Sequence, residues 1–236
     1  MNIKKYIPNF LTLLNLFCGC VALVFVAESN FEMVFFFVAL GIFFDFFDGF
    51  FARLFKVSGP LGVQLDSLAD MVTSGVVPGF TIFKVLSNDF MLGQNSYLPY
   101  LGFVITLGAC YRLAKFNIDT RQSESFIGLP TPANTLFILS LPLIHWDKLG
   151  NFLPNETIFC YFLIGICFLS AYVMNAEIPL FSLKIKNFSF SKYKLQISFL
   201  IVSLFLLGFF QALGVALVIV LYVLLSVVNN LFFTKK

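Results

Sequence analysis

Charged residues are scarce in this 236-residue chain: Asp, Glu, Lys and Arg make up 11%, whereas hydrophobic residues make up 59%. A soluble domain usually carries about 25% charged residues. The 34 phenylalanines would leave large apolar patches on any soluble surface. The shortage of charge therefore excludes a soluble protein and predicts a polytopic membrane protein.

Long polar linkers and internal repeats are also missing, which favours one all-α membrane bundle over residues 1–236 with no soluble domain. At roughly 20 residues per span, the apolar segments accommodate about eight transmembrane helices. The predicted spans are residues 10–27, 33–55, 61–86, 97–117, 132–147, 156–175, 196–212 and 214–233. Residues 1–175 would form a six-helix catalytic core, and residues 176–236 a basic linker and a C-terminal helical hairpin.

Histidines and paired cysteines are too few for a zinc centre. The chain has one histidine, His145, and its five cysteines lie in apolar segments. Cys18 and Cys20 form a C-x-C pair, but no second Cys/His cluster completes a metal site. We expect the cysteines to be small buried hydrophobic side chains, and His145 beside Trp146 to be an anchor at the membrane edge.

The basic residues predict an orientation. If the N-terminus is cytoplasmic, Lys84 and Lys148 are the only two of the 15 Lys and Arg residues that fall outside. Lys and Arg are enriched in cytoplasmic loops, so both termini are predicted to be cytoplasmic. The apolar run from Phe10 to Ala27 is long for a signal peptide and is followed at once by further spans, so we expect a transmembrane helix there rather than a cleaved leader.

Two pairs of aspartates interrupt the apolar background. Asp45 and Asp48 are three apart near the end of the second predicted span, and Asp66 and Asp70 are four apart at the start of the third. Residues at these spacings share a helical face. The intervening KVSGP contains a Gly-Pro turn signal and makes the two helices an antiparallel hairpin. The four carboxylates are therefore predicted to converge at the cytoplasmic interface.

Such a cluster needs cations, because four carboxylates cannot all stay ionised at close range. Arg53 and Lys56 supply some positive charge, but one or two Mg²⁺ or Mn²⁺ ions match carboxylate oxygens better. Two ions on shared aspartates are a usual clamp for a pyrophosphate. Gly49, Ala52 and Gly62 would let a bulky substrate approach the backbone. A structural ion pair, or the proton or cation pathway of a transporter, stays open as an alternative.

The full pattern of spacings resembles the signature of the CDP-alcohol phosphatidyltransferase family. The eight matching positions are Asp45, Asp48, Gly49, Ala52, Arg53, Gly62, Asp66 and Asp70. The resemblance spans the first six predicted helices. It implies displacement at the β-phosphorus of a CDP-linked lipid by an alcohol hydroxyl, with release of CMP. It also implies that the four aspartates bind two divalent ions, Mg²⁺ or Mn²⁺, and that Asp70 is the general base.

The resemblance also implies a binding site for the CDP portion of the donor lipid. Its residues are Asn9, Thr12, Asp48, Gly49, Ala52, Arg53 and Gly62. Arg53 would make a bidentate phosphate contact. Asn9 and Thr12 have structural alternatives, a helix N-cap and a helix-packing hydroxyl respectively.

Within the family, the chain resembles the small integral-membrane members of bacteria and archaea whose acceptor is L-serine. The stretches that carry this narrower resemblance are NFLTLLNLFCG, LDSLADMVTSGVVPG, YRLAKFN and FIGLPTPAN. A serine site needs a cation for the carboxylate and polar partners. The candidates are Arg112, Asn117, Arg121, Thr131 and Asn134. Ordinary cytoplasmic-side charge and a plain helix start explain the same residues nearly as well, and glycerol-3-phosphate or inositol phosphate stays open as the acceptor.

The resemblance further implies CDP-diacylglycerol and L-serine as substrates, contact with membrane lipids, a homodimer, and a place in the cytoplasmic membrane of a prokaryote with the site at the cytoplasmic face. No nucleic acid partner is expected. A cation-coupled transporter is the hypothesis from another class, and it predicts ionisable residues across the whole bilayer. The outer halves of the second and third spans carry no charge between the aspartates and Glu32 or Lys84 at their outer ends. This pattern favours an enzyme at the interface.

Overall fold

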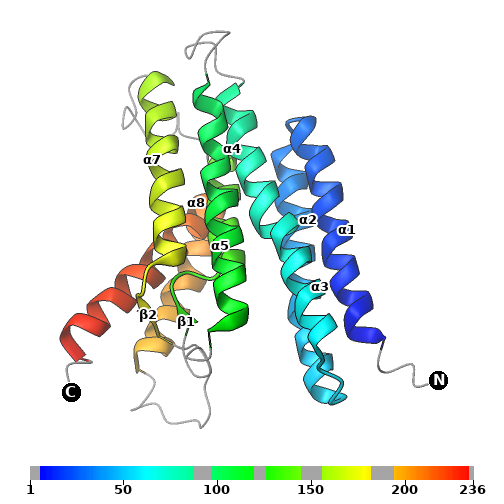
Figure 1. Cartoon of the computed structure of the whole chain (residues 1–236). Coiled ribbons are helices and arrows are strands. Elements are labelled where there is room, and N and C mark those ends of the chain that lie inside the picture. The colour runs from blue at the N-terminus through cyan, green and yellow to red at the C-terminus, as the bar shows by residue number, and fades with distance from the viewer. Residues whose placement is uncertain (1–5, 88–96, 120–125, 145–155, 182–193, 234–236) are drawn as a thin grey trace.

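The computed structural model describes residues 6–87, 97–119, 126–144, 156–181 and 194–233. These residues are mostly helical, and Figure 1 shows the long helices packed side by side as a bundle. The elements in order are α1 (Ile7–Ala27), α2 (Phe31–Leu54), α3 (Pro60–Asp70), the π-helix η2 (Met71–Val76), α4 (Val77–Ser87), the 3₁₀ helix η4 (Leu98–Phe103), α5 (Val104–Ile118), β1 (Phe126–Ile127), α6 (Thr131–Ser140), the 3₁₀ helix η5 (Leu141–Leu143), α7 (Glu156–Asn175), β2 (Pro179–Leu180) and α8 (Lys194–Phe233).

Six of the described helical segments are long and apolar enough to cross a membrane. One of them, Pro60–Ser87, contains α3, η2 and α4, and another, Leu98–Ile118, contains η4 and α5. The predicted all-α membrane bundle is thus confirmed with six candidate spans among the described residues. The predicted span 132–147 coincides with α6 and η5, and its residues 145–147 lie outside the described part of the chain.

The last helix, α8, reverses direction at Gln211, whose φ of 47° is left-handed. A side chain on Gly214 would meet the main chain of Leu206 and Leu207, which is possible only where the helix folds back on itself. Figure 1 shows the part before the bend and the part after it at a steep angle, with the C-terminus toward the same end as the N-terminus. The bend lies at the boundary predicted between the last two spans.

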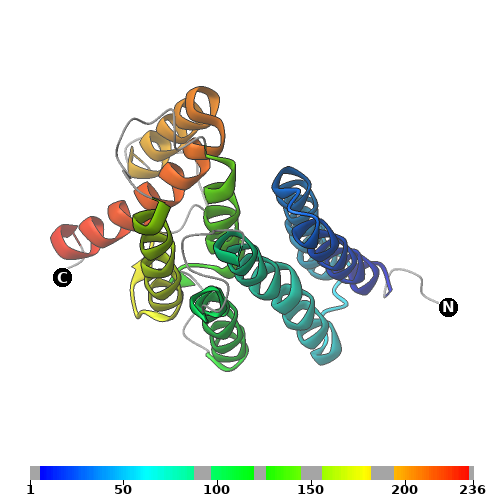
Figure 2. The same ribbon diagram turned by 90° about the horizontal axis from the view of Figure 1, so that it is seen from above.

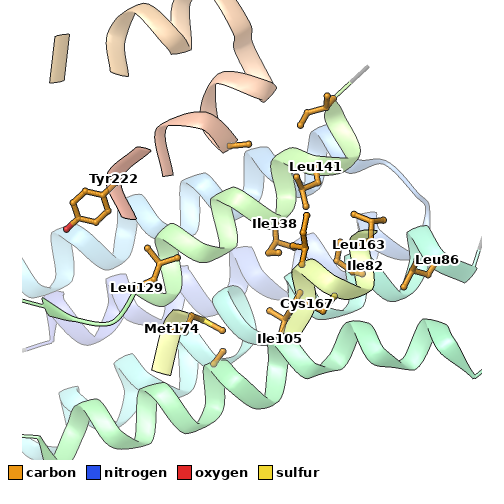
Figure 3. Close-up of a cluster of buried hydrophobic side chains, with 14 of the residues drawn as sticks. Ile82, Leu86, Ile105, Leu129, Ile138, Leu141, Leu163, Cys167, Met174 and Tyr222 are labelled. Carbon is orange, nitrogen blue, oxygen red and sulfur yellow. The ribbon is translucent and has the colours of Figure 1, made fainter. Parts of the chain in front are cut away.

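Two clusters of buried apolar side chains hold the bundle together. The smaller one joins α1 and α2 to α4 and α6, through residues such as Val26, Val38 and Leu139. The larger one contains side chains from every α-helix between α4 and α8, and Figure 3 shows many of them. Figure 2, a view down the bundle, places α1 and α2 on one flank and α7 and α8 on the other. The helices α4 and α6 therefore connect the two flanks.

The cysteine expectation is correct in part. Cys18, Cys160 and Cys167 are buried, as predicted, but Cys20 and Cys110 are exposed on the outside of the bundle. Both lie on apolar helices whose outward faces suit lipid, so a buried place was the wrong inference from an apolar segment. His145, Trp146, Arg121 and residues 182–193 of the expected basic linker lie outside the described residues.

Candidate active site

The aspartate hairpin lies at the end of the bundle nearest the N-terminus, at the bottom of Figure 1. Asn30 caps the far end of α2, where its side chain accepts from the Met33 N–H at 3.3 Å. At the near end, Lys56 takes a left-handed φ of 56°, and the Val57 N–H bonds back to Ala52 O at 3.0 Å. This C-terminal capping turn lets α3 begin at Pro60 and brings the two helices together.

Three of the four predicted metal ligands form a compact oxygen cluster. Carboxylate oxygens of Asp45, Asp48 and Asp66 all lie within 4.8 Å of one another. Within the described part of the chain, no Lys or Arg nitrogen lies within 4.0 Å of them. Uncompensated carboxylates this close together repel one another, and an all-oxygen donor set is the one that Mg²⁺ and Mn²⁺ prefer. The residues present therefore fit a hard divalent ion.

The fourth aspartate, Asp70, lies outside that three-oxygen group and is buried to much the same extent as Asp48. It is 8% exposed, and it interacts electrostatically with Asp45 and Asp66. The Asn15 side-chain amide donates to its Oδ1 at 3.1 Å. This contact fixes the orientation of the Asp70 carboxylate and leaves its second oxygen for other chemistry.

Helix α1 contacts both aspartate-bearing helices through two side chains three residues apart. Thr12 donates its hydroxyl hydrogen bond to Asp48 Oδ2, and Asn15 reaches Asp70. Thr12 is 3% exposed and Asn15 is fully buried. Asn15 was not among the predicted site residues, although a polar amide in an apolar span, one turn after Thr12, is a signal that could have identified it.

A cleft of about 880 Å³ opens beside the aspartates. All seven residues predicted to hold the CDP portion line it, together with Asp45 and Asp66; the seven are Asn9, Thr12, Asp48, Gly49, Ala52, Arg53 and Gly62. A Cβ on Gly49 would come within 3.4 Å of Arg53 Nη1, so the guanidinium lies across the glycine. The volume is in the range of small-molecule sites.

The structural alternatives for the two α1 residues have different outcomes. The N-cap of α1 is Tyr6, and Asn9 lies inside the helix, so the N-cap interpretation of Asn9 is wrong. Instead, Asn9 Oδ1 would be 3.5 Å from a Cβ on Gly62, across the cleft in α3. The Thr12 hydroxyl links α1 to α2 through Asp48, so it has a packing role and also borders the cleft.

The predicted acceptor residues lie apart from the cleft lining, around the cytoplasmic end predicted for α5. Arg112 is 4% exposed, and its guanidinium donates to Gly128 O at 3.4 Å. Gly128 has a φ of 75°, and its N–H bonds to Ile178 O at 2.8 Å beside the short β1–β2 ladder. The loop before α6 is thereby tied down where it meets Arg112.

The other predicted acceptor residues lie in two places, at the end of α5 and in the first turn of α6. Asn117 donates to Ser67 Oγ at 2.8 Å, which places it next to the aspartates of α3. Thr131 and Asn134 are buried in the first turn of α6. The Asn134 side-chain nitrogen has no hydrogen-bond partner among the described residues, whereas its oxygen accepts from Ser170 at 2.5 Å. Arg121 lies outside the described residues.

A bundle of membrane-spanning helices with an oxygen-ligand cluster beside a nucleotide-sized cleft has the architecture of an integral-membrane enzyme. The chain belongs to the CDP-alcohol phosphatidyltransferase family, whose model matches residues 5–183. This confirms the resemblance carried by the aspartate spacing, and it favours an enzyme of phosphatidyl transfer over a transporter.

Relatives with a more specific name are similar over much of the chain. A Bacillus subtilis (strain 168) CDP-diacylglycerol–serine O-phosphatidyltransferase is 36% identical over 132 residues, which cover 54% of this chain and 70% of that protein. The protein of the same name from Helicobacter pylori (strain ATCC 700392 / 26695) is 29% identical over 232 residues, 97% of this chain and 92% of its own. The one from Methanocaldococcus jannaschii is 28% identical over 164 residues, 70% and 71% respectively.

Proposed function

We propose that this enzyme transfers the phosphatidyl group of CDP-diacylglycerol to the hydroxyl of L-serine, giving phosphatidylserine and CMP. The name shared by the relatives supports the donor and the acceptor. The observation that carries the proposal is the cluster of Asp45, Asp48 and Asp66 oxygens within 4.8 Å of one another, on the wall of a cleft of about 880 Å³.

The three clustered aspartates would hold divalent ions, Mg²⁺ or Mn²⁺, and we propose two ions, with Asp70 at the inner side of the site. Bound ions of this kind neutralise a pyrophosphate and make an alcohol hydroxyl easier to deprotonate. Arg53 lies at the cleft with its guanidinium over Gly49, where it can bind a phosphate through two N–H groups. The small residues Gly49 and Ala52 leave space for the nucleotide against α2.

Asp70 would act as the general base. Its carboxylate takes the proton of the serine hydroxyl while the hydroxyl oxygen forms a bond to the β-phosphorus. The bond from that phosphorus to the bridging oxygen breaks, and CMP leaves with the electron pair. The Asn15 amide holds one Asp70 oxygen, which keeps the other in a defined direction for the proton.

The buried cation Arg112 would bind the serine carboxylate. A guanidinium has five N–H donors, and the one hydrogen bond described for it is 3.4 Å long. The buried amide nitrogen of Asn134, unpartnered among the described residues, is a further donor, and Thr131 lies three residues before it on α6. Asn117 is held beside Asp66 through Ser67, and we propose that it borders the same acceptor site.

We further propose the membrane arrangement that the basic residues indicate: eight spans, with the site and both termini at the cytoplasmic face of a prokaryotic membrane. The termini lie toward the same end of the bundle as the aspartate hairpin in Figure 1, which supports this arrangement. A homodimer is likewise proposed from the family resemblance.

A parallel acceptor assay tests the proposed function. Purified protein is given CDP-diacylglycerol, Mn²⁺ or Mg²⁺, and serine, glycerol-3-phosphate or inositol phosphate in separate reactions. We expect release of CMP and a labelled lipid product with serine. Incorporation of glycerol-3-phosphate but never of serine would overturn the acceptor assignment and leave phosphatidyl transfer itself intact.

A further inference from the structure

The third span changes its helical type immediately after Asp70. Helix α3 ends there, and Met71–Val76 continue as a π-helix in which the Val77 N–H bonds to Val72 O, five residues earlier. π-turns inside α-helices are rare and often lie at functional sites. No proline lies within this turn, but Pro78 follows Ser74 by four residues. Because proline has no N–H and its ring crowds the carbonyl four residues earlier, Ser74 O loses its helical donor and needs another one.

Two threonine hydroxyls from other helices bind main-chain carbonyls of the π-turn. Thr135 on α6 donates to Ser74 O at 2.9 Å, and Thr106 on α5 donates to Gly75 O at 2.9 Å. A π-turn changes the ladder of main-chain hydrogen bonds, and Ser and Thr side chains are the usual means of satisfying displaced carbonyls in a membrane helix. The turn is therefore held from two sides by hydroxyl donors.

The opposite side of the turn is held by α1 and α2. The Thr73 hydroxyl has two acceptors in reach, Ala69 O on its own helix at 3.1 Å and Asn15 O on α1 at 3.3 Å. Asn15 is the residue whose side chain binds Asp70. A Cβ on Gly19 would come within 2.6 Å of Thr73 Oγ1, and one on Gly41 within 3.1 Å of its Cγ2. Four helices thus fix the π-turn, and one of them also fixes the Asp70 carboxylate.

We propose that Thr135 and Thr106 are positioning residues, which hold the π-turn and thereby set the place of Asp70 relative to Asp45 and Asp66. The inference rests on the proposed role of Asp70 in phosphatidyl transfer. Because Asp70 is the last residue before the turn, a rotation of the turn moves its carboxylate. Misplacement of a reacting group by about 1 Å can cost a reaction on the order of 100-fold.

Thr81 provides a matched control for Thr135. Both side chains are fully buried, and both hydroxyls bind the carbonyl four residues earlier on their own helix, at 2.8 Å to Val77 O and 2.9 Å to Thr131 O. Only Thr135 also reaches the π-turn. Valine has nearly the shape of threonine without the hydroxyl, so the difference between Thr135→Val and Thr81→Val isolates the bond to Ser74 O.

The test measures turnover and amide hydrogen exchange on the purified full chain in lipid nanodiscs. We expect Thr135→Val to lower kcat about tenfold with an unchanged KM for CDP-diacylglycerol, because the cleft is lined by other residues. Exchange should be faster over residues 71–77. Thr106→Val should act in the same direction, Thr135→Ser should stay near wild type in both readouts, and Thr81→Val should change neither.

Three results would overturn the inference: equal kcat in Thr135→Val and Thr81→Val, equal damage in Thr135→Ser and Thr135→Val, or unchanged exchange over residues 71–77 in Thr135→Val. Failure of the proposed function is distinguishable, because it shows as a wild type that releases no CMP with any acceptor. In that case the exchange measurement still decides whether Thr135 holds the π-turn. The second part of the inference, that the turn places Asp70 for phosphatidyl transfer, then fails.

Discussion

The two helices that carry the aspartates have opposite surroundings. In the apolar part of α2, 22% of the residues are buried, against 56% in the span that contains α3 and α4. Phenylalanines of α2 are more than half exposed, such as Phe43 on its outer surface and Phe46 beside the cleft. The other span lies between the two flanks of the bundle and contacts α1, α5 and α6.

The four carboxylates differ in their place. Asp45 and Asp48 on α2 line the cleft, together with Asp66 on α3. Asp70 is reached from inside the bundle and is fixed by Asn15. We infer that the cleft, with α2 as its main wall, binds the CDP-lipid and that Asp70 on the inner span takes the proton.

Removal of divalent ions should have the largest effect, because it leaves the clustered carboxylates of both helices without a counter-charge. We expect activity to be lost in excess EDTA and restored by Mg²⁺ or Mn²⁺, as measured by CMP release. Full turnover in the presence of the chelator would contradict a metal role for the cluster.

Substitution of the inner aspartate should come next. Asp70→Asn keeps the shape of the side chain and removes the base, a loss of about 10²–10⁴-fold in kcat. Turnover is measured with saturating CDP-diacylglycerol and serine. A variant that turns over at nearly the wild-type rate would exclude Asp70 as the base.

Arg112→Ala should affect the acceptor more than the donor. Loss of a charge-assisted hydrogen bond of roughly 1.5–3 kcal/mol corresponds to an increase of about 10- to 150-fold in the KM for serine. The KM for CDP-diacylglycerol should change little, and Arg112→Lys should rescue only in part, because lysine lacks the two-pronged geometry.

Lys115→Ala is the matched control, since Lys115 lies on the same face of α5 and pairs with Glu177 at 3.6 Å on the surface. Its kinetic constants should stay near wild type. Equal increases of both KM values in Arg112→Ala would assign Arg112 to the lipid phosphate or to the fold.

The smallest effect is expected at the outer helix. Gly49→Ala places a Cβ in van der Waals contact with Arg53 Nη1, at 3.4 Å, and so restricts the guanidinium in its proposed phosphate contact. We expect the KM for CDP-diacylglycerol to rise about two- to tenfold with kcat unchanged. At Gly165 in α7, a Cβ meets nothing within 4 Å, so Gly165→Ala is the control. A change in the KM for serine alone in Gly49→Ala would contradict a place for Gly49 in the donor site.

The aspartate hairpin could be predicted from the sequence because its determinants are local. Spacings of three and four residues place each pair on one face, and the Gly-Pro turn folds α3 back on α2. The reversal in α8 was predicted from length, because residues 196–233 are about twice as long as one span needs. Helical periodicity also holds up to Asp70, where α3 ends.

The missed features depend on contacts between distant helices. The π-turn after Asp70 is held by Thr106 and Thr135, which are far along the chain. Pro78 is the local signal that the hydrogen-bond ladder is interrupted at Ser74. Asn15 likewise gains its role from a partner 55 residues away.

The division between the two helices is tested most directly by CDP-diacylglycerol binding to Asp48→Asn and Asp70→Asn, measured side by side by titration calorimetry with Mn²⁺ present. Asp48 belongs to the oxygen cluster in the cleft, and Asp70 lies outside both. We expect Asp48→Asn to weaken lipid binding strongly, and Asp70→Asn to bind nearly as the wild type does while failing to turn over. Equal loss of binding in both variants would exclude separate roles for the two aspartates and make Asp70 chiefly a metal ligand.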